Sequence, residues 1–238
     1  MTLFLHVLML FLLSGGSAEV VQTFEQECGQ FFAGGKSPTT FTGSRYMQIC
    51  QNLNGVVYYA TYYDTDNKIP VYSAYRFAGR KDCTRLDKWY IEPQLDDNNQ
   101  QPNMKLERDV VIPGLGVRQA LNGDYEKSGY DRGHLAPVYQ AQSQSCSDAT
   151  FTLANAAPQN PSFNRGVVPG TQTLKNRVNV PSHFWTAYCC LDQNNRCQIS
   201  KGFIGVNKNI PPQSKSVNAL ETELAKYYNV NPFKLFNV

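Results

Sequence analysis

Two neighbouring runs of β-branched and aromatic residues place the strongest constraint on how this chain folds. Residues 56–63 and 71–77 are both of this kind, and a polar segment at residues 64–68 separates them. Such side chains favour extended backbone, and a short polar segment between two such runs is typical of a hairpin. The pattern therefore predicts an antiparallel β-hairpin in the first third of the chain.

Further strand patterns follow this hairpin. Residues 184–191 and 202–206 predict two strands joined by a turn at residues 192–196. A weaker pattern at residues 137–142 is compatible with a strand, and residues 149–156 with a loop and a helix. Several strand runs with few helices between them predict an α+β fold with a largely antiparallel sheet.

One helix is expected near the end of the sequence. Val217, Leu220, Leu224 and Tyr227 recur at steps of three and four, and Ser216 precedes them as an N-cap. This spacing predicts a terminal amphipathic helix. Nothing in the composition marks a linker, so residues 19–238 are expected to form a single domain.

The first eighteen residues have the layout of a secretory signal peptide. Residues 3–13 are apolar apart from His6, and small residues lead up to a cleavage position after Ala18. The alternative is a membrane anchor, but the run is shorter than the roughly 20 residues that span a bilayer. Residues 1–18 are therefore expected to be removed, leaving a secreted, extracellular protein with no membrane attachment.

Secretion changes the interpretation of the seven cysteines, all of which follow the leader. An oxidising route favours disulfides, whereas a zinc site is disfavoured because no C-x-x-C pair exists. The number is odd, so at least one cysteine is free or bonded to another chain. The pairing and the oligomeric state cannot be read from the sequence.

The net charge of +3 is too small to indicate a nucleic-acid partner, and histidine is more informative. Only His134 and His183 follow the leader. His134 closes the run Asp131-Arg132-Gly133-His134, which joins a group that titrates near neutrality to an arginine suited to phosphate. His183, set before a strand, is interpreted as a structural hydrogen-bonding residue.

The segment downstream of this run has an unusual charge balance. No Asp or Glu lies between Asp148 and Asp192, and the cations there are Arg165, Lys175 and Arg177. Together with Arg132, these residues predict a phosphate-binding surface. Asn155 and Asn164 add neutral oxygen donors of the kind that suit a hydrated Mg²⁺. Taken singly, His134 could be a core histidine, and the two asparagines could be turn residues.

The same pieces carry a family resemblance. In order and spacing the chain resembles the DNA/RNA non-specific endonucleases, which are His-Me finger (ββα-metal) nucleases, on Asp131-Arg132-Gly133-His134, Ala136-Pro137, Asn155, Pro158-Gln159 and Asn164. The similarity covers roughly residues 50–230, and the leader and the cysteines fit the secreted endonuclease domain-containing 1 branch. It implies an α+β fold whose central antiparallel sheet is flanked by helices.

The resemblance also implies roles for individual residues. His134 would be the general base that activates water, and Asn164 would be the direct protein ligand of Mg²⁺, or of Mn²⁺ or another divalent cation. Arg132 would bind the scissile phosphate, and Asn155 would hydrogen-bond near it. Asp131 would hold the geometry of the motif. The implied partner is the DNA or RNA backbone, cut with little sequence preference.

One position departs from the family pattern. Gln172 stands where the family carries a glutamate that holds metal-bound water, and a glutamine brings no negative charge. Weaker Mg²⁺ affinity is therefore expected. Two hypotheses follow from this departure. One is a secreted Mg²⁺-dependent endonuclease, and the other is a weakened or inactive nuclease-fold protein that binds nucleic acid or another partner.

Overall fold

The structure is a computed structural model, and it describes residues 19–86, 88–165 and 174–237. The leader and Gln172 therefore lie outside the described residues. The fold is α+β, as the strand pattern predicted, and its named strands all pair antiparallel. None of the helices in the described ranges is long and apolar enough to cross a membrane.

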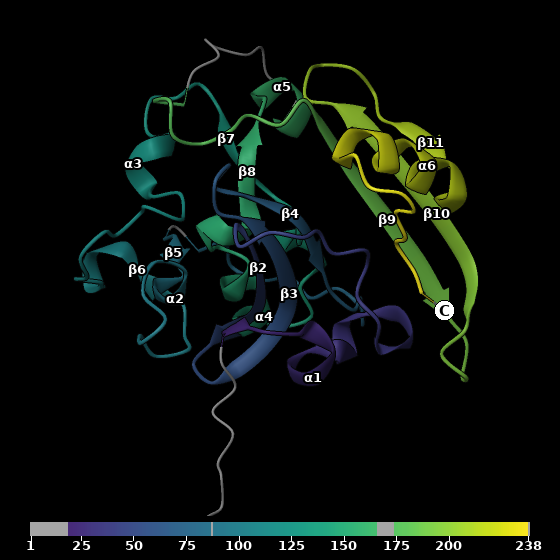
Figure 1. The fold of residues 1–238 in the computed structure, drawn as a ribbon, viewed down its shortest axis with the longest axis horizontal. Coiled ribbons are helices and arrows are strands. Elements are labelled where there is room, and N and C mark those ends of the chain that lie inside the picture. The colour runs from purple at the N-terminus through teal and green to yellow at the C-terminus, as the bar shows by residue number, and fades with distance from the viewer. Residues whose placement is uncertain (1–18, 87, 166–173, 238) are drawn as a thin grey trace, which may run out of the picture.

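A four-stranded sheet occupies the middle of the molecule (Figure 1). Its order is β1-β2-β3-β4, with bounds Val20–Val21, Tyr46–Leu53, Val56–Asp64 and Ile69–Ala74. Strands β3 and β4 are the predicted hairpin, which is confirmed. Strand β2 pairs with β3 along most of its length and was not predicted.

A second sheet has the order β11-β10-β9, with β9 at His183–Leu191, β10 at Cys197–Val206 and β11 at Gln213–Lys215. Helix α6 (Val217–Tyr228) covers it, and Ser216 caps the helix by accepting a hydrogen bond from the Ala219 amide. Leu220 lies so close to Gly202 of β10 that a Cβ there would be 2.6 Å from its Cδ2 atom. The predicted terminal helix and the strand pair before it are confirmed.

Smaller elements complete the fold. Two short ladders join β5 (Tyr90–Ile91) to β6 (Lys105–Leu106), and β7 (Asp131–His134) to β8 (Ala156–Gln159). The remaining α-helices are α1 (Phe24–Glu27), α2 (Pro93–Asp96), α3 (Asn122–Tyr125), α4 (Gln144–Ala149) and α5 (Pro161–Arg165). The described strands thus form a central four-stranded sheet, a three-stranded sheet and two short ladders, all antiparallel. The expectation of a strand at residues 137–142 is wrong, because Val138–Gln140 is a 3-10 turn that follows Pro137.

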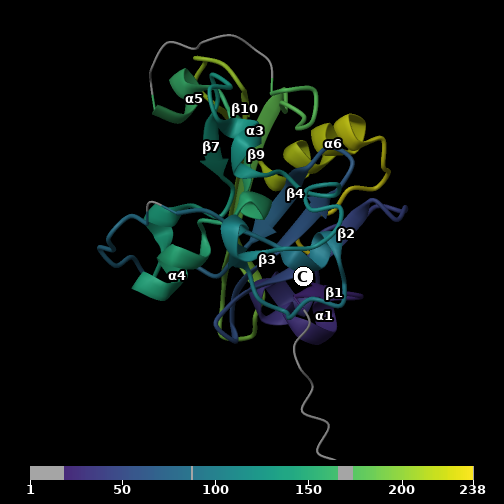
Figure 2. The same ribbon diagram turned by 90° about the vertical axis from the view of Figure 1, so that its left-hand side faces the viewer.

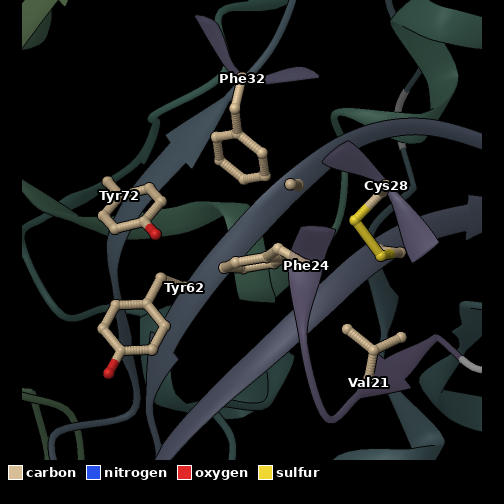
Figure 3. Packing of buried hydrophobic residues seen from close by; sticks show 8 residues of the cluster. Val21, Phe24, Cys28, Phe32, Tyr62 and Tyr72 are labelled. Carbon is tan, nitrogen blue, oxygen red and sulfur yellow. A yellow bond between two sulfur atoms is a disulfide. The ribbon is translucent and has the colours of Figure 1, made fainter. Parts of the chain in front are cut away.

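Both faces of the four-stranded sheet are buried. On one face Phe24 of α1 packs against Phe32, Tyr62 and Tyr72, beside the Cys28–Cys50 disulfide (Figure 3). On the other face Tyr59 is buried and donates a hydrogen bond to the Ala149 carbonyl. Burying a large apolar side chain stabilises the folded state by about 1.5–3 kcal/mol. These contacts therefore hold the sheet rigidly in place against the helices and loops that pack on its two faces.

A pair of buried carboxyl groups lies beneath this sheet. Glu19 and Glu92 are both 0% exposed, and Thr152 donates a 2.7 Å hydrogen bond to Glu92. Burial raises the pKa of both groups, and the negative charge of Glu92 raises that of Glu19 further. The pair therefore holds protons in the folded protein that the unfolded chain has already released.

This pair predicts a loss of stability as the pH rises. Because the folded pKa values lie above the unfolded ones, the stabilisation is complete in acid and declines as the pH rises through the folded pKa values. We expect Glu92→Gln to flatten that decline, so that its free energy of unfolding in urea exceeds that of the wild type at pH 8 but not at pH 5. Glu223→Gln, at a partly exposed ion pair with Lys215, is the control. Equal pH dependence in wild type and Glu92→Gln would contradict the expectation.

Candidate active site

The predicted motif lies on a two-stranded ladder followed by a helix. Strand β7 is the run Asp131–His134 itself, and it pairs with β8, after which α5 begins. Asn160 starts this helix by accepting a hydrogen bond from the Ser162 amide, and Pro161 takes the first helical position. Both views place β7 and α5 at the end of the molecule opposite α1 (Figure 1 and Figure 2).

Strand alternation divides the motif between two faces of this ladder. Arg132 and His134 share one face, and Asp131 and Gly133 share the other. A Cβ on Gly133 would lie 2.3 Å from the Gln159 Oε1 atom. Gly133 is therefore required for the close packing of β7 against the Gln159 side chain of β8.

His134 is held in an aromatic setting. Its ring centre lies 4.9 Å from that of Trp89 and 4.9 Å from that of Phe151. Burial, and after it the positive charge of Arg85, lowers the pKa of His134 to about 3. The Nε2 atom is buried with no hydrogen-bond partner among the described residues. The imidazole is therefore uncharged at neutral pH, with a nitrogen that no described protein group occupies.

The lowered pKa predicts an unusual pH profile if His134 takes up a proton in a reaction. The neutral ring persists far below the ordinary histidine pKa of about 6.5. Any rate that depends on this base should then stay constant from pH 8 to about pH 5, with no fall near pH 6.5. Arg85→Ala should move the acid limb upward, because it removes a cation that opposes protonation. A pH–rate profile of the wild type with a midpoint near 6.5 would contradict the lowered pKa of His134.

Arg132 lies beside His134 on the same face, and Trp89 contacts both. The guanidinium carbon of Arg132 is 5.4 Å from the ring centres of Trp89 and Tyr125. Its Nη2 atom donates to the backbone carbonyl and the side-chain oxygen of Asn122 at 3.2 and 3.3 Å. The Nε atom is buried and has no described partner. This cation thus keeps N–H donors that no described group uses, and these suit a phosphate oxygen.

On the opposite face Asp131 and Asn164 form a pair. The Asn164 Nδ2 atom donates a 2.9 Å hydrogen bond to Asp131, and Asn164 is otherwise exposed. Because the amide nitrogen faces the carboxylate, the Oδ1 oxygen is left for another partner. The described residues contain no cluster of three His, Cys, Asp or Glu. This donor set therefore fits a cation that keeps most of its water, such as Mg²⁺, and does not fit a fully protein-ligated metal.

Asn155, for which the resemblance implied a hydrogen bond near the phosphate, lies in the protein interior. It is 0% exposed, and its Oδ1 atom accepts from the Ala136 amide at 2.8 Å and from the Ser73 hydroxyl at 2.9 Å. Its Nδ2 atom donates to the Ala136 and Thr150 carbonyls, each at 3.0 Å. All its hydrogen-bonding positions are thus used by protein. Asn155 thus fixes the backbone just after His134, and its amide keeps no hydrogen-bonding position for a phosphate.

Two of the predicted phosphate-binding cations meet Arg132 at helix α3. Lys175 donates to the Gly123 carbonyl at 2.6 Å, and Arg177 pairs with Asp124 at 2.8 Å. Arg177 also donates to the Gly116 carbonyl. The structure therefore brings these cations together, but it assigns Arg177 to a structural ion pair. Arg165 ends α5, and its side chain, like Gln172, lies outside what the structure describes.

Sequence reasoning missed the residues that surround His134. Trp89, Arg85 and Phe151 all contact the ring or act on its charge. Arg85 belongs to a basic segment, residues 76–88, whose charge was a usable signal. Asn207 was also missed: it accepts from the Asn160 amide at 2.7 Å and donates to the Pro158 and Pro181 carbonyls, which ties α5 to the second sheet.

Known proteins resemble the chain over this region. A sequence family described as DNA/RNA non-specific endonuclease matches residues 38–170. The human endonuclease domain-containing 1 protein is 34% identical over 199 residues, which cover 69% of this chain and 39% of the relative. The mouse protein of that name is 30% identical over the same share of this chain and 38% of its own length. The chain thus spans about two fifths of these relatives.

Two further matches are to proteins named endonuclease G or EndoG. Human mitochondrial endonuclease G is 50% identical over 48 residues, which are 20% of this chain and 16% of that protein. A solved structure of an EndoG/EndoGI complex is matched with a TM-score of 0.45 and 21% identity, over 69% of this chain and 80% of that one.

Proposed function

The chain belongs to the DNA/RNA non-specific endonuclease family, and from this premise we propose that it hydrolyses phosphodiester bonds of DNA or RNA with a divalent cation. The observation that carries the proposal is the setting of His134. A neutral imidazole with an unoccupied buried nitrogen, beside Arg132 and Arg85, suits proton uptake next to an anionic substrate.

In the proposed reaction each residue of the ladder has one task. His134 accepts a proton at Nε2 from the water that attacks the phosphorus atom. Arg132 uses the N–H donors that no described group engages to bind a phosphate oxygen, where it stabilises the charge that develops. Tyr125 and Trp89 hold this guanidinium in place.

The opposite face of the ladder is the proposed cation site. Asn164 would ligate Mg²⁺, or Mn²⁺ or another divalent cation, through Oδ1, and Asp131 would orient the amide through its hydrogen bond. When bound, such a cation stabilises negative charge on the phosphate. A single neutral ligand gives weak affinity, and Gln172 in place of a glutamate lowers it further.

Gln172 also favours a second candidate function. Without the family's carboxylate, the chain could bind nucleic acid while cutting it slowly or not at all. We further propose secretion, on the basis of the signal-like residues 1–18 and the disulfides Cys28–Cys50 and Cys189–Cys197.

Digestion of plasmid DNA and of RNA over a range of Mg²⁺ concentrations, with EDTA as the blank, tests the proposal. Cleavage that requires Mg²⁺, and that needs a much higher concentration in Asn164→Ala, is the expected result. Asn218→Ala, an exposed asparagine on α6, is the matched control and should leave the Mg²⁺ requirement unchanged. Binding without cleavage at any Mg²⁺ concentration would favour the second candidate.

A further inference from the structure

A broad groove of ≈ 1700 Å³ runs past His134 between strands β4 and β9. Residues 71–74 line one side of it, residues 184–191 line the other, and His134 and Gln159 reach it from the ladder. The groove therefore borders the strand that carries the proposed general base.

The groove carries a marked charge imbalance. Its described lining holds four cationic side chains and one carboxylate: Lys36, Arg76, Arg80, Arg196 and Glu25. The carboxylate of Glu25 is engaged by the backbone and hydroxyl groups of Ser37, at 3.0 and 2.7 Å. A long lining with this balance suits a polyanion rather than a small neutral ligand.

Exposed aromatic rings line the same groove. Phe77, Tyr139 and Tyr188 are 61%, 65% and 45% exposed, which is unusual for large rings on a folded chain. The guanidinium of Arg80 lies 3.7 Å from the ring centre of Tyr139, and so covers one face of that ring. These rings, with no large apolar cover, offer flat surfaces to a planar partner.

We propose that this groove binds single-stranded nucleic acid, with unpaired bases stacked on Tyr139 and Phe77 and the phosphates beside the cations. In a duplex the base faces are already stacked on one another. Exposed aromatic rings therefore stack with unpaired bases and not with paired ones. The inference rests on the proposed function and deepens it, because it names the form of the substrate. Single strands are held more tightly than duplexes of the same length.

Fluorescence anisotropy with a labelled 20-nucleotide single strand and the matching duplex tests this, with the full chain in EDTA so that no cleavage occurs. We expect tighter binding of the single strand. Tyr139→Ala should weaken it roughly tenfold and Tyr139→Trp should restore it, since base stacking on one ring is worth about that factor. Tyr227→Ala, an exposed ring on α6 outside the groove, is the matched control.

Two outcomes separate this inference from the proposed function. A protein that cleaves plasmid in Mg²⁺ but binds both strand forms equally, with Tyr139→Ala unchanged, overturns the inference and leaves the nuclease intact. A protein that prefers the single strand through Tyr139 but cleaves nothing supports the inference and overturns the proposed function.

An independent observation concerns two cysteines without a disulfide, Cys83 and Cys146. The segments that carry them run side by side. The Lys81 amide donates to the Ala141 carbonyl at 3.0 Å, and Thr84 and Gln144 exchange two hydrogen bonds of 2.9 Å. Burial raises the pKa of the Cys146 thiol, and the nearby Cys83 raises it further, so the two sulfur atoms lie within electrostatic reach.

We propose that Cys83 and Cys146 form a third disulfide in the secreted protein. One thiolate attacks a low-molecular-weight disulfide such as oxidised glutathione and expels one thiol. The second cysteine then displaces the other thiol, so that two electrons reduce the small disulfide and the two cysteine protons end on its thiols. The bond would anchor the segment that carries Arg80 and Arg85, and Cys190 would be the odd cysteine.

Counting thiols in the denatured protein after glutathione oxidation tests the bond, together with mass mapping of unreduced peptides. One free thiol is expected in the wild type, none in Cys190→Ser and two in Cys83→Ser, with a linked Cys83–Cys146 peptide in the first two proteins. Three free thiols in the wild type, or a linked peptide that joins Cys190 to either residue, would overturn the proposal.

Discussion

His134→Ala is expected to lower the rate of Mg²⁺-dependent cleavage by about 10²- to 10⁴-fold, the usual contribution of a general base. The reason is geometric as well as chemical. The imidazole is neutral and shares its face of β7 with Arg132, and His134 is one of the residues that border the basic groove. A plasmid-nicking assay at saturating Mg²⁺ measures the change.

The control for this variant is the other imidazole. His183 forms a hydrogen bond with Ser182 and lies against Tyr227, away from the ladder, so His183→Ala should cleave like the wild type. Because the His134 ring packs between Trp89 and Phe151, His134→Gln provides a variant of closer volume, and thermal melting confirms that each variant folds. Cleavage that survives both substitutions at His134 would mean a misassigned base or a contaminating nuclease.

Asn155→Ala is expected to lower the free energy of unfolding by about 3–5 kcal/mol. The change leaves the buried Ala136 amide and the Ala136 and Thr150 carbonyls without their partner, and each unpaired buried group costs about 1–3 kcal/mol. Ser73→Ala removes one of the four hydrogen bonds at a half-buried position and should cost about 1 kcal/mol. Urea denaturation monitored by tryptophan fluorescence gives both values.

This comparison also tests the assignment of Asn155 as a positioning residue. A variant with the stability of the wild type but no cleavage would place Asn155 in contact with the substrate, as the family resemblance implied. A variant that is unstable, yet cleaves at temperatures where it remains folded, agrees with the hydrogen bonds seen here.

The sequence predicted local features well, because local chemistry determines them. The hairpin of β3 and β4 follows from two strand-forming runs and a polar turn, and α6 follows from its spacing and its serine cap. The sequence did not predict the hydrogen bond that joins Asp131 to Asn164, because these residues lie 33 positions apart in the chain.

What the sequence could not show depends on long-range packing. Trp89 and Arg85 lie far from His134 in the chain, and nothing local indicates that they surround it. In the sequence Arg177 has no acidic neighbour and was therefore predicted to bind phosphate. In the structure α3 places Asp124 beside it, and the two form an ion pair. In the sequence Asn155 is a candidate oxygen donor to a ligand. In the structure its amide is buried, and all four of its hydrogen bonds are made to protein groups.

The bonds of Asn207 bear on how the chain can be dissected. The family match ends at residue 170, yet the start of α5 is held by a side chain from the end of β10, which also bonds the Pro158 carbonyl on β8. A fragment cut at the boundary of the match would therefore lose the anchor of the helix that carries Asn164. We therefore expect that a fragment which keeps α5 folded must extend beyond the family match and include the second sheet.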